Sequence, residues 1–207
     1  TAYQNAAYAE RYRELVEHVR KADTDAQQRL SKAVARYYFK LLAYKDEYEV
    51  ARLYSDATFR KQLEAQFEGD YQLQFHVAPS WLSKPDAVTG QPRKRSFGPW
   101  MLKAFGVLAR FKFLRGSVLD PFGHSAERRL ERELIEEYEA NVAYLLAELN
   151  AGNYRTAVAL AEIPEQIRGY GHVKEAALAK AREQATQLKA RLTVSEIAAV
   201  QLFEPAA

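Results

Sequence analysis

A turn with two glycines and two basic side chains is the part of the sequence best suited to bind a ligand. The heptapeptide RGYGHVK, residues 168–174, precedes a run with helical periodicity. Helix N-termini that follow glycine-rich turns bind phosphate and other anions, because free backbone N–H groups and the positive end of the helix dipole face the ligand. The turn is therefore either purely structural, or it contacts an anion or another domain. The candidate residues are Arg168, Gly169, Gly171, His172 and Lys174.

The sequence of this turn departs from the known nucleotide-binding motifs. Lys174 stands where G-x-G-x-x-G has its third glycine, and the preceding segment is not a strand, so neither a dinucleotide fold nor a P-loop is predicted. Gly169 and Gly171 can adopt positive φ. Two cations beside a helix N-terminus are unfavourable unless a negative group offsets them. We expect a carboxylate of the chain itself, such as Glu162 or Glu165, with a sibling-domain acid or a bound anion as alternatives.

A second candidate is a basic segment with interleaved aromatic residues. Residues 87–119 contain no Asp or Glu. Such a segment can form a surface for an acidic partner, a nucleic acid or a phosphorylated cofactor. Alternatively, its aromatic residues face a core while its basic residues meet solvent or pair with the acid-rich stretch 127–139. The net charge of +3 does not favour nucleic acid. The basic residues are Arg93, Lys94, Arg95, Lys103, Arg110, Lys112 and Arg115, and the aromatic residues are Trp100, Phe105, Phe111 and Phe113.

The remaining polar residues predict neither a catalytic site nor a metal site. The histidines, at positions 18, 76, 124 and 172, are far apart and form no i,i+4 pair. The absence of cysteine excludes disulfides, a thiolate nucleophile and cysteine-bound zinc or iron–sulfur clusters within this chain. A run of carboxylates alternates with arginines at helix-pair spacing, which predicts a solvated helix face. These carboxylates are Glu131, Glu133, Glu136, Glu137 and Glu139, and the arginines are Arg128, Arg129 and Arg132.

The elements that must position these residues are mainly helices. Apolar residues recur at helical spacing along most of the chain, and helices are expected at about 99–116, at 126–150 with Ser125 as N-cap, at 154–161 and from 172 onward. The predicted fold is mostly α, a helical bundle in a single domain of residues 1–207. The predicted buried stripes are Tyr8, Tyr12, Leu15 and Val19; Leu30, Val34, Tyr37 and Leu41; Phe59, Leu63 and Phe67; Leu130, Leu134, Tyr138, Val142, Leu145 and Leu149; and Val173, Ala177, Ala181, Ala185, Leu188 and Leu192.

A small β-hairpin insert is expected at about 70–98. Residues 71–77 alternate between apolar and polar, which places Tyr71, Leu73, Phe75 and Val77 on one buried face. A strand cannot stand alone, and its expected partner is Arg93–Phe97. No apolar run reaches the ~20 residues of a membrane span, and no leader opens the chain. Since the chain starts at Thr1, we expect a piece of a longer cytoplasmic protein.

Five phrases that occur in this order carry a family resemblance. They are RLSKAVARYYFKLLAYKDEYEVARLY, LQFHVAPSWLS, KRSFGPWM, FLRGSVLDPFGHSAERRLERELIEEYE and EIPEQIRGYGHVKEAALAKA. Over roughly residues 28–192, the chain resembles the C-terminal domain of the large, single-chain indolepyruvate ferredoxin oxidoreductases of bacteria. The resemblance implies a parent enzyme that oxidatively decarboxylates 2-oxo acids to acyl-CoA. It uses thiamine diphosphate with Mg, 4Fe-4S clusters and CoA, and ferredoxin accepts the electrons.

The residues that perform this chemistry are not expected within this chain. The clusters need cysteines, and thiamine diphosphate needs a Gly-Asp-Gly segment, whereas the phrase EGDYQ at 68–72 lacks the flanking glycine and the metal-binding asparagine. We therefore expect a non-catalytic C-terminal domain without cofactor, packed on sibling catalytic domains. Ferredoxin and a second copy of the parent are further partners of the whole enzyme. The alternative is a free-standing adaptor that binds an acidic protein through Arg93–Arg95 and the 103–115 face.

Overall fold

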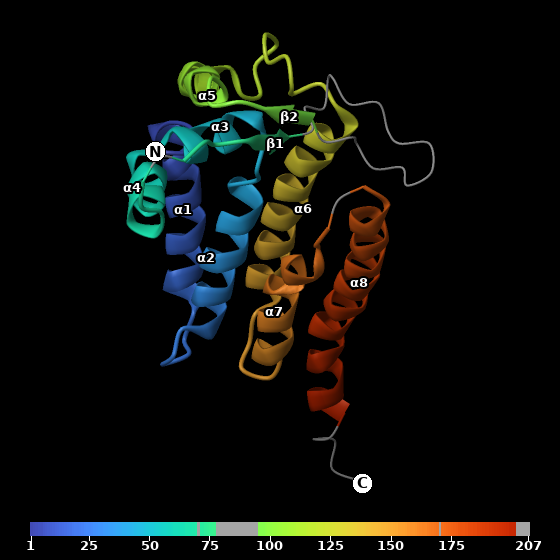
Figure 1. The fold of residues 1–207 in the computed structure, drawn as a ribbon. Coiled ribbons are helices and arrows are strands. Elements are labelled where there is room, and N and C mark those ends of the chain that lie inside the picture. Colours follow the sequence, from blue (N-terminus) through green and yellow to red (C-terminus); the bar gives the residue numbers. More distant parts are fainter. Residues whose placement is uncertain (70, 78–94, 170, 202–207) are drawn as a thin grey trace, which may run out of the picture. The chain divides into compact units, whose positions relative to one another are not determined.

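The chain folds mainly into helices, with one small antiparallel sheet, as the sequence predicts (Figure 1). The computed structural model describes residues 1–69, 71–77, 95–169 and 171–201. Where the sequence predicts a single domain, the contacts divide the chain into two compact units. Unit 1 comprises Thr1–Ala6 and Tyr44–Leu130, and unit 2 comprises Ala7–Ala43 and Glu131–Ala207. None of the described helices is both long and apolar enough to cross a membrane.

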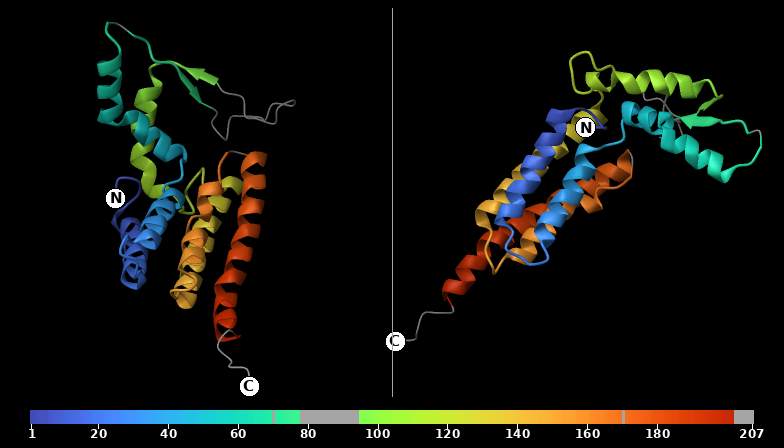
Figure 2. Two further views of the ribbon diagram at one scale, coloured as in Figure 1. Left: turned by 90° about the horizontal axis from the view of Figure 1, so that it is seen from below. Right: turned by 90° about the vertical axis from the view of Figure 1, so that its left-hand side faces the viewer.

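Unit 2 is the predicted helical bundle (Figures 1 and 2). It holds nearly all of α1 (Ala6–Ala22), the larger part of α6 (Ala126–Glu148), and all of α2 (Arg29–Leu42), α7 (Tyr154–Ala161), the 3₁₀ helix η2 (Ile163–Gln166) and α8 (His172–Gln201). The predicted stripes supply its core, because one face of each helix is apolar. Side chains that are fully buried there include Val19, Leu30, Val34, Val142, Leu145, Leu160 and Leu192.

A ladder of tyrosines joins three helices of unit 2. The ring of Tyr12 in α1 stacks on Tyr38 in α2 at 5.8 Å between centroids, and Tyr38 stacks on Tyr138 in α6 at 6.0 Å. The Tyr138 hydroxyl donates to the carbonyl of Ala161 at 2.9 Å, which also ties α6 to the end of α7. Offset ring stacking adds to the free energy of area burial, and the hydroxyl is satisfied, so the ladder helps to fix the spacing of these helices.

The last predicted stripe is buried at its four later positions, whereas Ala177 is only partly buried. Ala181, Ala185, Leu188 and Leu192 of α8 are buried, but Val173 is 52% exposed. Val173 lies in the first turn of α8 and covers Gly169 instead of the core: a Cβ on that glycine would come within 2.7 Å of the Val173 Cγ1.

Unit 1 contains α3 (Glu47–Ser55), α4 (Ala57–Gln66), the strands β1 (Phe75–Val77) and β2 (Arg95–Phe97), α5 (Met101–Arg110) and the 3₁₀ helix η1 (Phe111–Leu114). Helix α3 is absent from the sequence prediction. Its start carries a recognisable signal, since Asp46 caps it and accepts from the Glu49 N–H at 2.8 Å in a D-x-x-E pattern. The core of unit 1 contains a cluster of Ala51, Phe75 and Phe105.

The hairpin forms with the described part of the predicted partner segment, but it is shorter than predicted. Phe75 lies opposite Phe97, and Val77 lies opposite Arg95. Phe75 is buried, whereas Tyr71, predicted to share its face, is 42% exposed. The strand cannot extend back to Tyr71 because the chain after Phe97 turns into α5 through Pro99, which has no N–H to donate. The predicted partner residues Arg93 and Lys94 lie outside the described residues.

Candidate functional site

The glycine turn has the backbone geometry that its sequence predicts. Gly169 and Gly171 have φ of +92° and +55°, a region that residues with a Cβ rarely adopt. Helix α8 begins directly after them, at His172, whose side chain lies outside the described residues. The turn therefore presents a helix N-terminus, and its function depends on which groups face it.

The two cations of the turn are neutralised by carboxylates of the same unit, which confirms that part of the prediction. Arg168 Nη2 lies 3.1 Å from the Glu165 Oε1, and its Nε donates to the Glu165 carbonyl at 2.9 Å. Lys174 pairs with Glu131 of α6, and these two side chains are only 13% and 12% exposed. Glu165 was an expected partner, but Glu131 was not. A contact with an external anion or a sibling domain remains a prediction.

Two residues of α2 that the sequence analysis missed hold the segment before the turn. The Lys40 ammonium donates to the carbonyls of Pro164 at 2.5 Å and Ile167 at 3.2 Å. The Tyr37 hydroxyl donates to the Glu165 Oε2 at 2.7 Å. Burial, with the charges of Arg168 and Lys174 beside it, lowers the pKa of Lys40. No sequence signal links these residues, because more than a hundred positions separate α2 from η2.

The glycine turn gives a direct prediction for stability. We expect Gly169→Ala to lower the free energy of unfolding by about 1–3 kcal/mol. The new Cβ would clash with Val173, and alanine rarely adopts the positive φ of this position. Gly171→Asn is the matched control, because asparagine tolerates the left-handed conformation and a Cβ there has nothing within 4 Å. Urea titration followed by circular dichroism measures both. Equal losses in the two variants would contradict the assigned role of Val173.

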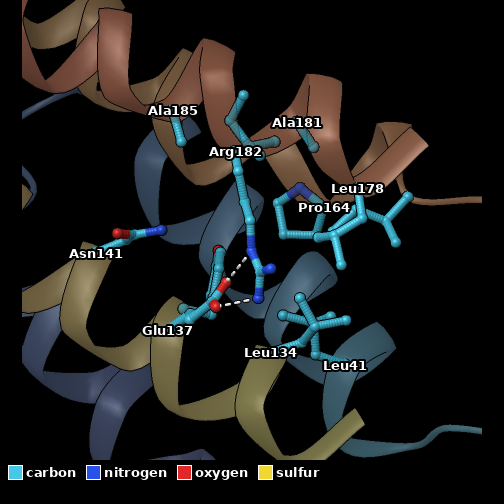
Figure 3. A pocket seen from close by; sticks show the side chains of 12 residues that line it. Leu41, Leu134, Glu137, Asn141, Pro164, Leu178, Ala181, Arg182 and Ala185 are labelled. Carbon is cyan, nitrogen blue, oxygen red and sulfur yellow. Dashed lines mark hydrogen bonds and ion pairs between the residues drawn. The ribbon is translucent and has the colours of Figure 1, made fainter. Parts of the chain in front are cut away.

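A small hollow lies between α6, η2 and α8 in unit 2 (Figure 3). Its volume is about 30 Å³, enough for a water molecule or two. Figure 3 shows the Arg182 side chain reaching from α8 to Glu137 of α6. Arg182 also bonds Glu133 at 3.1 Å. The hollow is thus bordered by an ion pair between helices and has no room for a cofactor. It is lined by Leu41, Leu134, Glu137, Tyr138, Asn141, Ile163, Pro164, Ile167, Leu178, Ala181, Arg182 and Ala185.

The carboxylate run on α6 only partly follows its prediction. Glu133 and Glu136 are exposed, as a solvated face requires. Glu139, however, is bonded by Arg11 of α1 at 2.6 Å and 2.8 Å and by the Tyr38 hydroxyl. Although burial raises the pKa of Glu139, the hydrogen bonds from Arg11 and Tyr38 lower it below its usual value. Four carboxylates of this run therefore join α6 to other helices, with partners from α1, α2 and α8 that local spacing cannot indicate; they are Glu131, Glu133, Glu137 and Glu139.

The basic-aromatic segment divides between core and surface within unit 1. Phe105 is buried, and so is Arg115, which bonds both carboxylate oxygens of Asp46. Lys112 donates to the Ala2 carbonyl at 2.7 Å. Phe105, Lys112 and Arg115 therefore have structural roles and are not part of a partner-binding surface.

The other basic and aromatic residues that the sequence analysis names in this segment meet solvent where they are described. Trp100, Phe111 and Phe113 are 59%, 44% and 67% exposed, so the interpretation that places them in a core is wrong. Arg95 is exposed on β2. Arg93 and Lys94 lie outside the described residues. The accessible part of the segment is thus the outer face of α5 and its continuation.

The described histidines lie in separate surroundings. His76 Nδ1 lies 2.9 Å from the Ser96 hydroxyl across the hairpin, and His124 Nε2 lies 3.2 Å from the Val118 carbonyl. His18 is exposed on α1. Within the described ranges, no group of three or more potential metal ligands occurs.

Comparison with known proteins identifies a family for nearly the whole chain. A family model described as a family of unknown function, DUF6537, matches residues 1–187. The chain belongs to the DUF6537 family. The match covers unit 1 and extends through unit 2 into α8, so both units are part of the family's domain. No curated protein and no solved structure matches the chain.

Proposed function

We propose that this chain is a non-catalytic domain that packs on the catalytic domains of an indolepyruvate ferredoxin oxidoreductase. One observation carries the proposal: charged groups at the glycine turn and in the interior of unit 1 are paired with one another inside each unit. The pairs Arg168–Glu165 and Lys174–Glu131 occupy the glycine turn, and Arg115–Asp46 is buried in unit 1. Side chains held in such pairs contribute to the fold, and the pairing makes them less available for proton transfer or substrate binding.

The identity of the parent enzyme is supported by the ordered phrases across residues 28–192. A chain without cysteine cannot hold cysteine-ligated clusters, so the 4Fe-4S clusters, and with them thiamine diphosphate, Mg and CoA, belong to sibling domains of the same polypeptide. In this proposal the domain acts in the cytoplasm. It supports assembly of the parent or covers its active site, and ferredoxin binds elsewhere on the enzyme.

A second candidate function, an adaptor for an acidic protein, is favoured by a different observation. The outer face of α5 presents apolar and basic side chains to solvent. The two proposals predict different reading frames. If the domain proposal holds, the reading frame that encodes this chain continues upstream into domains that bind thiamine diphosphate and the clusters. A reading frame that contains this domain alone would favour the adaptor.

The domain proposal predicts an inactive isolated chain. Purified chain mixed with indolepyruvate, CoA, thiamine diphosphate, Mg and oxidised ferredoxin is expected to reduce no ferredoxin above a buffer control, because it supplies no cluster ligands. Added to a separately produced catalytic region from the same reading frame, it is expected to co-elute in size-exclusion chromatography. Turnover by the chain alone, or separate elution of the two parts, would refute the proposal.

A further inference from the structure

Helix α5 carries an apolar stripe on the side that faces solvent. Trp100 and Val107 are 59% and 56% exposed, and helical spacing places Phe111 on the same stripe. The opposite side of the helix packs into the core of unit 1, where Phe105 is buried. Four further side chains of the helix pack against the core cluster: Met101, Leu102, Leu108 and Ala109. The helix is therefore apolar on both sides, and one side is uncovered.

The apolar surface continues beyond the end of α5. The ring of Phe113 lies 6.0 Å from that of Phe111 and is 67% exposed. Most large apolar side chains that are exposed in the described part of the chain fall between residues 100 and 119. Exposed apolar patches of this kind mark interaction sites, since leaving them in water is unfavourable. We call Trp100, Lys103, Val107, Arg110, Phe111 and Phe113 the α5 surface.

The charge on the α5 surface has one sign. Lys103 and Arg110 lie on the exposed stripe, and no ion pair joins either of them to another described residue. Residues 87–119 contain no acid that could neutralise them. A partner that covers the apolar side chains must therefore bring carboxylates to meet these cations.

We propose that the α5 surface binds an acidic amphipathic helix of a partner protein. Apolar side chains of that helix would cover Trp100, Val107 and Phe111, and its Asp or Glu residues would pair with Lys103 and Arg110. The proposal rests on this surface alone and holds whether the partner is a sibling domain or a separate protein.

The same observations disfavour two other classes of partner. A nucleic acid needs many phosphate contacts, but Lys112 and Arg115 of this segment already bond to Ala2, Tyr3 and Asp46. Lipid surfaces are recognised through clusters of about 4–8 Lys or Arg, whereas the α5 surface has two, Lys103 and Arg110.

A selection from displayed helical peptides tests the proposal on the whole chain. We expect enriched peptides to carry apolar residues at i, i+3, i+4 and i+7 with flanking Asp or Glu. Against the best such peptide, Val107→Glu is expected to weaken binding by at least about tenfold. The Lys103→Glu/Arg110→Glu variant is expected to lose this peptide and to bind its counterpart with Lys in place of each acid. Phe39→Glu, at a side chain of α2 that is 61% exposed, is the control and should bind as the unaltered chain does.

The other outcomes overturn the proposal. No enrichment, enrichment of neutral or basic peptides, or binding that is insensitive to the α5 variants would show that this surface does not recognise acidic helices. Parallel titrations use single-stranded oligothymidine and vesicles of phosphatidylcholine with phosphatidylserine. If the chain bound the oligothymidine or the vesicles more tightly than the peptide, and Val107→Glu abolished that binding, the surface would be reassigned to nucleic acid or to membrane. Unchanged circular dichroism of each variant shows that the fold is intact.

Discussion

Arg115→Met is expected to lower the free energy of unfolding of unit 1 by about 3–5 kcal/mol, because it leaves the carboxylate of Asp46 buried without its counter-charge. Both side chains are 3% exposed, and the guanidinium donates to the two carboxylate oxygens at 2.5 Å and 2.8 Å. It also lies 3.8 Å from the ring centroid of Tyr3 and donates to that residue's carbonyl at 2.6 Å. A single side chain thus joins the N-terminal segment, the start of α3 and the end of η1.

Further variants separate the contributions at this site. Arg115→Lys should recover only part of the loss, since an ammonium cannot reproduce the two-pronged contact. Asp46→Asn keeps the cap of α3 but removes the charge, and the Asp46→Asn/Arg115→Met double variant should lose less than the sum of the single losses. Arg110→Met, at an exposed position, should change stability by less than about 0.5 kcal/mol. Urea titrations that find Arg115→Met and Arg110→Met equal would show that the buried pair contributes nothing.

The sequence does not distinguish the basic residue that is buried from those at the surface. Arg115 and Arg110 lie in the same acid-free segment, and both fit an interaction surface equally well by composition. The difference comes from Asp46, which is 69 positions away and reaches Arg115 only in the folded unit. Pairing over such distances is decided by tertiary packing, and a single sequence carries no local signal for it.

Periodic patterns, by contrast, predict most of the helices. Ser125 caps α6 as expected and accepts from the Arg128 N–H at 3.2 Å, because a hydroxyl before an apolar run is a local signal. Alternation in residues 71–77 also indicates the first strand, and the need of a strand for a partner indicates the second, which forms at Arg95–Phe97. Tyr71 was misplaced because alternation continues past the point where the partner strand ends. Sequence patterns thus locate elements well and their limits less well.

The glycine turn shows where chemical reasoning from sequence succeeds. Like charges at a helix N-terminus need a negative partner, and the structure supplies Glu165 and Glu131. Electrostatics required a carboxylate but could not name the helix that brings it. Glu131 lies on α6, and its pairing with Lys174 joins α6 to α8 within unit 2.

The short hairpin gives a second large expected effect, at Phe75. Phe75→Asp is expected to lower the free energy of unfolding of unit 1 by about 4 kcal/mol or more, since it removes a buried ring and places a carboxylate in an apolar cluster. The Phe75 ring is 5% exposed and packs edge-on against Tyr54 at 5.4 Å and Phe105 at 5.5 Å between centroids. The loss should therefore reach α3 and α5 as well as the strand.

Gln74, the residue directly before β1, provides the control, because the alternation of residues 71–77 places it opposite to Phe75. Gln74 is exposed, so Gln74→Asp should cost less than about 1 kcal/mol. Urea titration followed by circular dichroism, with hydrogen exchange of the amides in α3 and α5, compares the two variants. Phe75→Asp is expected to speed exchange in both helices, and Gln74→Asp in neither. If the two variants were equally stable, Phe75 would not be part of the core, and the hairpin would be attached to unit 1 only through its chain ends.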